Sequence, residues 1–224
     1  MAHRPPERAL QALQILRLRL HRLEPSRPLR DARAAAAFVR ERGMVMESAR
    51  SSLPALTEAI AGREIRGSWM ADREVFRIYR ILRGMPAHGI VSAPLVEGKD
   101  TLFTPVLGPA VERVATDPER RTRAAAASTP LARRLLAAVE RDGEVRMDRW
   151  PGPTAPARAA RLLLTRQLLV RSRSLHTERG YHTAMVIPWR ASPLSRRFSG
   201  RAKRLSYDAA HPPPGRPARR RRGA

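Results

Sequence analysis

Hydrophobic residues in the first half of the chain recur at helical spacing and later alternate as in strands. Leucines three or four residues apart predict a helix over residues 5–23, which begins with two prolines and breaks at the proline-containing residues 24–28. Further helices are predicted to end at Gly43, Gly62 and Gly84. In order, these later elements are helix 31–42, an extended run at 44–46, helices 53–61 and 71–83, and a hairpin of residues 89–96 and 101–107 around the turn 97–100.

The second half of the chain repeats this order of elements. Thr129 suits an N-cap and Pro130 a first helical residue, so a helix is predicted over residues 130–141. A Pro/Gly-rich stretch stands where the middle helix of the first half lies, and residues 116–128 fit a linker or a linking helix equally well. The other predicted elements are an extended run at 144–147, a helix over 154–167, and β-like runs at 168–174 and 181–188.

A helix, a short strand, two helices and a β-hairpin in this order are typical of the winged-helix variant of the helix-turn-helix. We therefore expect a mainly α protein with small β-hairpins, an α+β fold made of tandem winged-helix units. The expected parts are an N-terminal helix and linker (1–28), a first unit (29–115), a linker (116–128), a second unit (129–195) and a disordered basic tail (196–224).

The charge of the chain favours a polyanionic partner. The 44 basic residues exceed the 20 acidic ones, which gives a formal net charge of +24 and favours double-stranded DNA as the partner. All basic residues except Lys99 and Lys203 are arginines, and codon bias in a GC-rich genome would produce the same excess. Charge therefore favours nucleic-acid binding without establishing it.

Several classes of site and location are not expected from the composition. The chain has no cysteine, and its six histidines are spread singly, so we expect no metal and no cofactor. No run approaches the roughly 20 apolar residues of a membrane span, and arginines interrupt the N-terminal apolar stretch in a way that signal peptides avoid. We expect a cytoplasmic, nucleoid-associated protein without membrane contact.

Two arginine-rich helices are the candidate DNA-binding elements, since arginine can grip guanine or phosphate with two hydrogen bonds. On the predicted helix 71–83, four arginines form one stripe, which fits either DNA contact or an ordinary solvated face: Arg73, Arg77, Arg80 and Arg83. On the predicted helix 154–167, Arg158, Arg161 and Thr165 share a stripe, and the hairpin that follows adds Arg171, Arg173 and Arg179. For this second set we favour DNA contact, because helix and hairpin agree.

The chain resembles the AlkZ-related proteins, a winged-helix family related to DNA glycosylases of the YcaQ type, which release alkylated or cross-linked bases. The resemblance rests on FVRERG at residues 38–43, LPALTEAIAGR at 53–63, the stretch 69–83 and the helix-plus-wing pattern over 130–189. It implies tandem winged helices that act on DNA, with a role related to repair.

The catalytic motif of the active glycosylases is not kept at the matching positions. In those enzymes a Gln-x-Gln or Gln-x-Asp motif follows the first helix, and the positions here are Met46, Glu47 and Ser48. Glu47 is the one candidate general base, and an exposed loop glutamate is its simpler interpretation. We therefore expect a DNA-binding protein without glycosylase activity, with an active glycosylase or a winged-helix transcription regulator as the alternatives.

Overall fold

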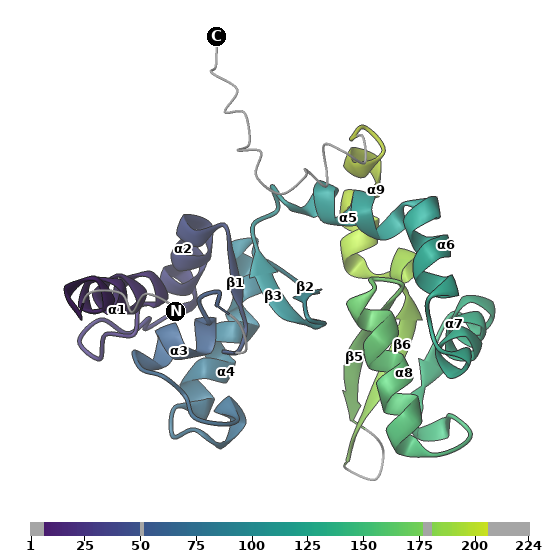
Figure 1. Cartoon of the computed structure of the whole chain (residues 1–224), viewed down its shortest axis with the longest axis horizontal. Coiled ribbons are helices and arrows are strands. Elements are labelled where there is room, and N and C mark those ends of the chain that lie inside the picture. The colour runs from purple at the N-terminus through teal and green to yellow at the C-terminus, as the bar shows by residue number, and fades with distance from the viewer. Residues whose placement is uncertain (1–6, 50–51, 177–180, 206–224) are drawn as a thin grey trace, which may run out of the picture. The chain divides into compact units, whose positions relative to one another are not determined.

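The computed structural model describes residues 7–49, 52–176 and 181–205 of the chain (Figure 1). The chain forms two compact units, Met1–Pro105 and Val106–Ala224. Both are mostly helical, and each contains a small antiparallel sheet of three strands. The α+β class expected from the sequence is therefore confirmed.

The first unit carries its helices ahead of and between the strands of its sheet. In chain order the elements are α1 (Glu7–His21), α2 (Ala32–Arg42), β1 (Met44–Met46), α3 (Leu56–Ala61), the 3-10 turn η1 (Trp69–Ala71), α4 (Val75–Gly84), η2 (Met85–His88), β2 (Val91–Val96) and β3 (Lys99–Phe103). The sheet order is β1-β3-β2, so the last strand lies in the middle. Asp31 caps α2 because its Oδ1 accepts a hydrogen bond from the Ala34 amide at 2.8 Å.

Buried side chains from α2, α3 and α4 form the core of this unit. Phe38, Leu56, Ile60, Ile78 and Ile81 are all at most 2% exposed. Each such side chain stabilises the fold by about 1.5–3 kcal/mol through removal of apolar surface from water. The positions of α3 and α4 are therefore set by their contacts with α2.

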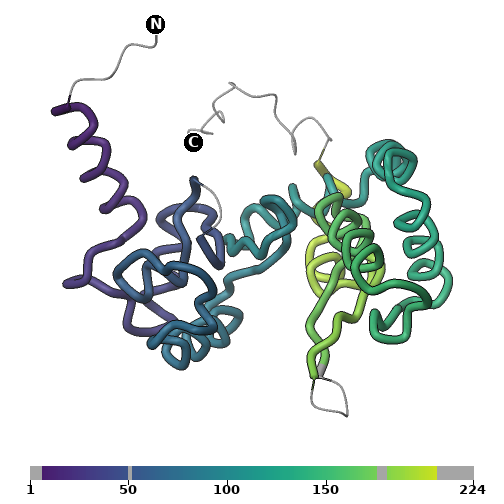
Figure 2. The backbone as a smooth tube through the Cα atoms, turned by 60° about the horizontal axis from the view of Figure 1, so that its bottom comes forward, coloured from purple at the N-terminus to yellow at the C-terminus, as the bar shows by residue number. Residues whose placement is uncertain are grey.

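Helix α1 stands at the edge of the first unit (Figure 2), and none of its residues is buried. Two polar contacts hold its C-terminal half. The Arg17 Nη2 lies 2.8 Å from the Glu64 Oε1, and the Arg42 Nε donates to the Leu20 carbonyl at 3.0 Å.

The sequence prediction for the helix 71–83 was wrong at its start. Residues 69–71 form a separate 3-10 turn, and α4 starts only at Val75. Helix α4 ends at Gly84, where the sequence placed the stop, and the chain then continues into η2 and turns at Gly89, where φ is +78°. A Cβ at Gly84 would lie 2.7 Å from the Cβ of Ala32, so glycine is required here for close packing of α4 on α2.

The second unit repeats the arrangement and adds three helices. Its elements are α5 (Gly108–Thr116), α6 (Pro118–Ala126), α7 (Pro130–Asp142), β4 (Val145–Arg146), η3 (Met147–Arg149), α8 (Thr154–Arg166), β5 (Val170–His176), β6 (His182–Pro188), η4 (Trp189–Ala191) and α9 (Pro193–Ala202). The sheet order β4-β6-β5 again places the last strand in the middle. The core of α7, α8 and the sheet includes Leu135, Val139, Leu164, Val170 and Val186.

The prediction of a disordered tail from residue 196 was wrong over the described residues. Helix α9 packs on α5, and its Leu194, Phe198 and Ala202 are buried. The buried Glu112 carboxylate on α5 accepts hydrogen bonds from the Trp189 Nε1 at 2.8 Å and the Ser195 Oγ at 2.5 Å. Residues 206–224 of the expected tail lie outside the described part of the chain.

The boundary between the two units also differs from the predicted one, because α9 packs on α5. Helix α5 belongs to the second unit, so the division falls after Pro105 and not at residue 115. Residues 118–126 of the expected linker form α6, which decides between the two interpretations of that segment in favour of a helix.

Candidate nucleic-acid interface

Helix α4 exposes a face that mixes aromatic and basic side chains. Phe76 is 85% exposed and Tyr79 is 53% exposed, while Arg80 and Arg83 also face solvent. Tyr79 and Arg80 each lie three or four residues from both Phe76 and Arg83, so the four positions share one side of the helix. Neither Phe76 nor Tyr79 was among the predicted site residues, and the core contacts of α4 come from Ile78 and Ile81.

Arg77 does not belong to the exposed stripe that the sequence predicted. Its Nη2 donates to the Ile60 carbonyl at 2.8 Å, and its Nε lies 3.1 Å from the Glu74 Oε2. The Arg77 guanidinium therefore fastens α4 to the end of α3. Arg73 is exposed, but it precedes the helix.

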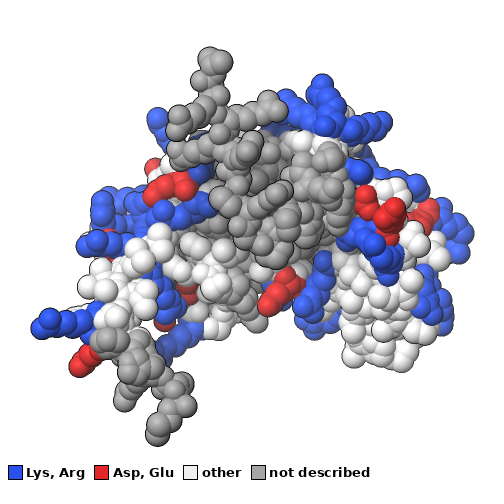
Figure 3. All heavy atoms as spheres, turned by 45° about the horizontal axis from the view of Figure 1, so that its top comes forward, with Lys and Arg blue, Asp and Glu red and all other residues white. Residues whose placement is uncertain are grey.

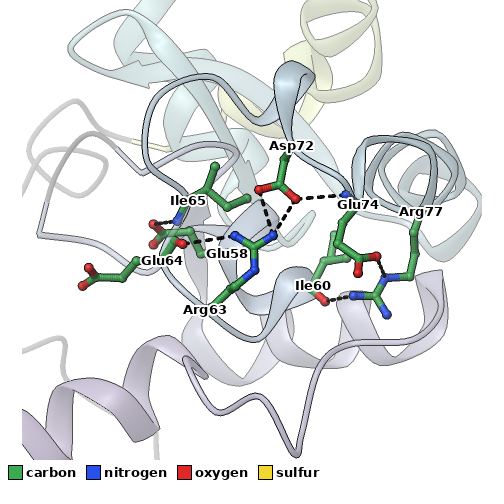
Figure 4. A network of polar contacts seen from close by, with 8 residues as sticks. All are labelled: Glu58, Ile60, Arg63, Glu64, Ile65, Asp72, Glu74 and Arg77. Carbon is green, nitrogen blue, oxygen red and sulfur yellow. Dashed lines mark hydrogen bonds and ion pairs between the residues drawn. The ribbon is translucent and has the colours of Figure 1, made fainter.

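A polar network holds the start of α4 against the end of α3 (Figure 4). The Arg63 Nη2 donates to both oxygens of Asp72, at 2.8 and 2.9 Å, and the Asp72 Oδ1 accepts from the Glu74 amide at 2.9 Å. The Glu74 amide and the Arg63 guanidinium hold the pKa of Asp72 below its usual range, against a smaller opposing effect of burial. Nearby, the Glu58 Oε1 accepts from the Ile65 amide at 3.0 Å.

This network has an electrostatic consequence for the exposed face of α4. Asp72 and Glu74, the two acidic residues at the start of the helix, are each paired with an arginine. The solvent-facing positions of the helix itself carry Arg80 and Arg83 as their charged groups. The exposed face of α4 is therefore positive.

Helix α8 of the second unit exposes a different set of side chains from the one predicted. Arg158, Leu162 and Arg166 are exposed at four-residue spacing. Thr165 is 5% exposed, and its hydroxyl donates to the Arg161 carbonyl at 2.8 Å, so it is not available to a ligand. Arg166 was missed by the sequence analysis, although its spacing from Arg158 and Leu162 is a signal that could have found it.

Arg161 links α8 to the hairpin. Its Nη1 donates to the Ser172 Oγ of β5 at 2.8 Å. Burial lowers the pKa of Arg161, and the charge of Arg158 lowers it further. Arg161 thus positions the helix against the strand, and it is only partly exposed.

The hairpin β5–β6 carries the remaining predicted arginines. Arg173 is exposed and Arg171 is half-buried, and both precede the turn on β5. They pair with Met185 and Ile187 of β6, two positions apart, so they lie on one face of the sheet. Arg179 lies outside the described residues.

Glu47 is not the exposed loop residue that its position suggested. It follows β1, where its amide donates to the Asp100 carbonyl at 2.8 Å and its carbonyl accepts from the Thr57 amide at 3.1 Å. Burial and the negative charge of Asp100 raise the pKa of Glu47 to about 7, although a hydrogen bond with Trp69 opposes the shift. A carboxyl group with this pKa exchanges a proton near neutral pH, as a general acid or base must.

Positive charge is spread over the surface beyond these helices. On the face drawn in Figure 3, Lys and Arg side chains clearly outnumber Asp and Glu in both units. Among residues 7–49, 52–176 and 181–205, no group of three His, Asp or Glu is arranged to hold a metal ion. Over the same residues, no helix has the length and apolar content needed to cross a membrane.

The chain matches no protein-family model, and comparison with curated proteins and with solved structures gives no match either.

Proposed function

We propose that the chain is a DNA-binding protein of two tandem winged-helix units. The observation that carries this proposal is the repeated arrangement: in each unit, a helix with an exposed basic face directly precedes the hairpin of the sheet. In winged-helix proteins this helix enters the major groove and the hairpin touches the backbone or the minor groove. The groove-entering role falls to α8, with β5–β6 as its wing, and α4 occupies the corresponding place in the first unit.

The dimensions and chemistry of α8 support this role. Its 13 residues make a rod about 20 Å long, and the major groove is about 12 Å wide, enough for one helix. Arg158 and Arg166 are two turns apart on its exposed side, and Arg173 adds an exposed positive charge on the hairpin. Each guanidinium can bind phosphate or guanine with two parallel hydrogen bonds.

We further propose a repair-related role in the bacterial nucleoid, without base release. The resemblance to the AlkZ-related proteins supports the role. Met46 and Ser48 support the lack of base release, because neither side chain supplies the amide or carboxylate of the glycosylase motif.

Titration of the full chain into a fluorescein-labelled 24-base-pair duplex, followed by anisotropy, tests the proposal. Arginine–phosphate contacts release counterions, so the log of the affinity should fall with log salt concentration with a slope of about −0.9 per contact. Six contacts correspond to about a thousandfold between 50 and 200 mM salt. Absence of binding at 50 mM salt would refute DNA binding, and a strong preference for one short palindrome would favour a transcription regulator.

A second candidate function, base release, is favoured by the environment of Glu47. A half-buried carboxyl group with a pKa of about 7, next to Asp100, has the protonation behaviour of a catalytic acid or base. An abasic-site assay on alkylated duplex DNA separates the candidates. Release of bases by the native chain but not by Glu47→Gln would establish the glycosylase, and no release by either supports the binding protein.

A further inference from the structure

We propose that the exposed face of α4 stacks on unpaired bases, so that the chain prefers DNA with a bulge or a single-stranded stretch over an intact duplex. This inference rests on the proposed DNA binding and names the form of DNA that the first unit recognises. It assigns Phe76 and Tyr79 to a binding role.

The two aromatic side chains are exposed to a degree that the fold does not explain. Phe76 is 85% exposed and Tyr79 is 53% exposed, although both lie on a helix whose opposite side supplies Ile78 and Ile81 to the core. Aromatic residues bury 150–250 Å² when they are covered, so leaving them in water forgoes a large favourable free energy. Two such residues three positions apart form a flat apolar surface that a planar partner would cover.

The charge around these rings complements nucleic acid. Arg80 and Arg83 lie on the same face of α4, and the Arg83 Cζ lies 5.8 Å from the centroid of the Tyr79 ring. The acidic Asp72 and Glu74 at the start of the helix are already paired with Arg63 and Arg77. Aromatic rings interleaved with arginines are the combination by which proteins hold single strands, with bases stacked on the rings and phosphates on the cations.

An intact duplex does not satisfy this face. Paired bases hide their planes in the stack and offer only their edges in the grooves, where thymine methyl groups are the main apolar contact. Unpaired bases expose both planes, and stacking on an aromatic ring tolerates any base. Helix α8 differs in this respect, because its exposed large apolar residue is Leu162 at 37%, between two arginines and without an aromatic ring.

The test compares two labelled probes: a 24-base-pair duplex, and the same duplex with a central bulge of three nucleotides that includes 2-aminopurine. We expect the full chain to bind the bulged probe at least about tenfold more tightly and to quench the 2-aminopurine. In Phe76→Leu/Tyr79→Leu the apolar character stays but stacking is lost. The ratio of the two affinities should then fall about five- to hundredfold, the range for removal of one stacked base, and quenching should disappear.

Conservative and remote variants complete the test. Phe76→Trp and Tyr79→Phe keep the rings and should keep the ratio. Leu13→Ala/Leu16→Ala on α1 removes two side chains that are 59% and 50% exposed, and it should leave the ratio unchanged. Equal affinity of the native chain for both probes would overturn the inference and assign the face to an apolar protein partner, while the proposed duplex binding would stand. No binding to either probe would defeat both proposals.

Discussion

The packing of α9 on α5 predicts an energetic coupling between Gly108 and Phe198. Phe198 is 1% exposed, and its ring lies over Gly108 so closely that a Cβ at position 108 would come within 2.4 Å of the Phe198 Cζ. No real Cβ contact is that short, so Gly108→Ala must push the ring out of its place. In the absence of the ring, the same methyl group has room.

The magnitudes follow from the two kinds of change. Phe198→Ala removes a buried aromatic ring and should cost about 3–5 kcal/mol. Gly108→Ala alone should cost about 1–3 kcal/mol through overpacking. In the Phe198→Ala background, Gly108→Ala should cost no stability. It should instead raise the free energy of unfolding by up to about 1 kcal/mol, because alanine loses less backbone entropy in a helix than glycine does. The expected coupling is therefore about 1–3 kcal/mol or slightly more.

Guanidinium denaturation of the four chains, followed by tryptophan fluorescence, measures this double-mutant cycle. Trp150 and Trp189 both report on the second unit. Additive effects, with Gly108→Ala equally costly in both backgrounds, would show that Phe198 does not pack on Gly108.

Three further predictions concern other parts of the fold. Asp72→Asn should lower the melting temperature at neutral pH. Because the pKa of Asp72 is depressed in the folded protein, the melting temperatures of the two chains should converge as the pH falls through this pKa, as a pH series of thermal melts would show. The pKa of Glu47 is raised to about 7, so the native chain loses stability as the pH rises from 4.5 to 7. Over this range, the free energy of unfolding of Glu47→Gln, measured by urea denaturation, should rise relative to that of the native chain by on the order of 2 kcal/mol. A difference between the two chains that does not change with pH would refute the burial of the carboxyl group. Ending the chain after Ser192 removes Leu194 and Phe198 and should cost several kcal/mol, whereas ending it after Leu205 retains them; equal melting temperatures would contradict the docking of α9.

Local chemistry made most of the helix and strand boundaries predictable from the sequence. The positive-φ glycines Gly43 and Gly62 and the N-cap Thr129 all act where the sequence placed them. The run at 44–46 forms β1 with the predicted bounds.

The errors arise where distant parts of the chain decide the outcome. Helix α9 is polar in composition, and it is held by α5, more than 70 residues earlier in the sequence. Gly84 was predicted only as a helix stop, and its role in close packing depends on Ala32 of another helix. Neither contact leaves a local signal.

The candidate sites show the same limit. Helical spacing identified arginine stripes, but spacing does not tell which side of a helix meets the core. Arg77 and Thr165 turned out to be engaged by backbone carbonyls, while Phe76 and Tyr79 are exposed although their apolar character suggested burial.

Two charge-matched double variants test whether α8 places its exposed arginines against DNA. Arg158→Ala/Arg166→Ala and Arg8→Ala/Arg19→Ala each remove two exposed positive charges, from α8 and from α1 respectively. Affinity for a 24-base-pair duplex is measured by anisotropy at several salt concentrations, with folding of each variant checked by thermal melting.

If α8 contacts DNA, the α8 variant should lose at least tenfold in affinity, with a salt slope shallower by about one for each lost phosphate contact. The α1 variant should lose far less. Equal losses in the two variants would refute the DNA contact of α8, because they would show that DNA binding depends only on the total charge of the chain.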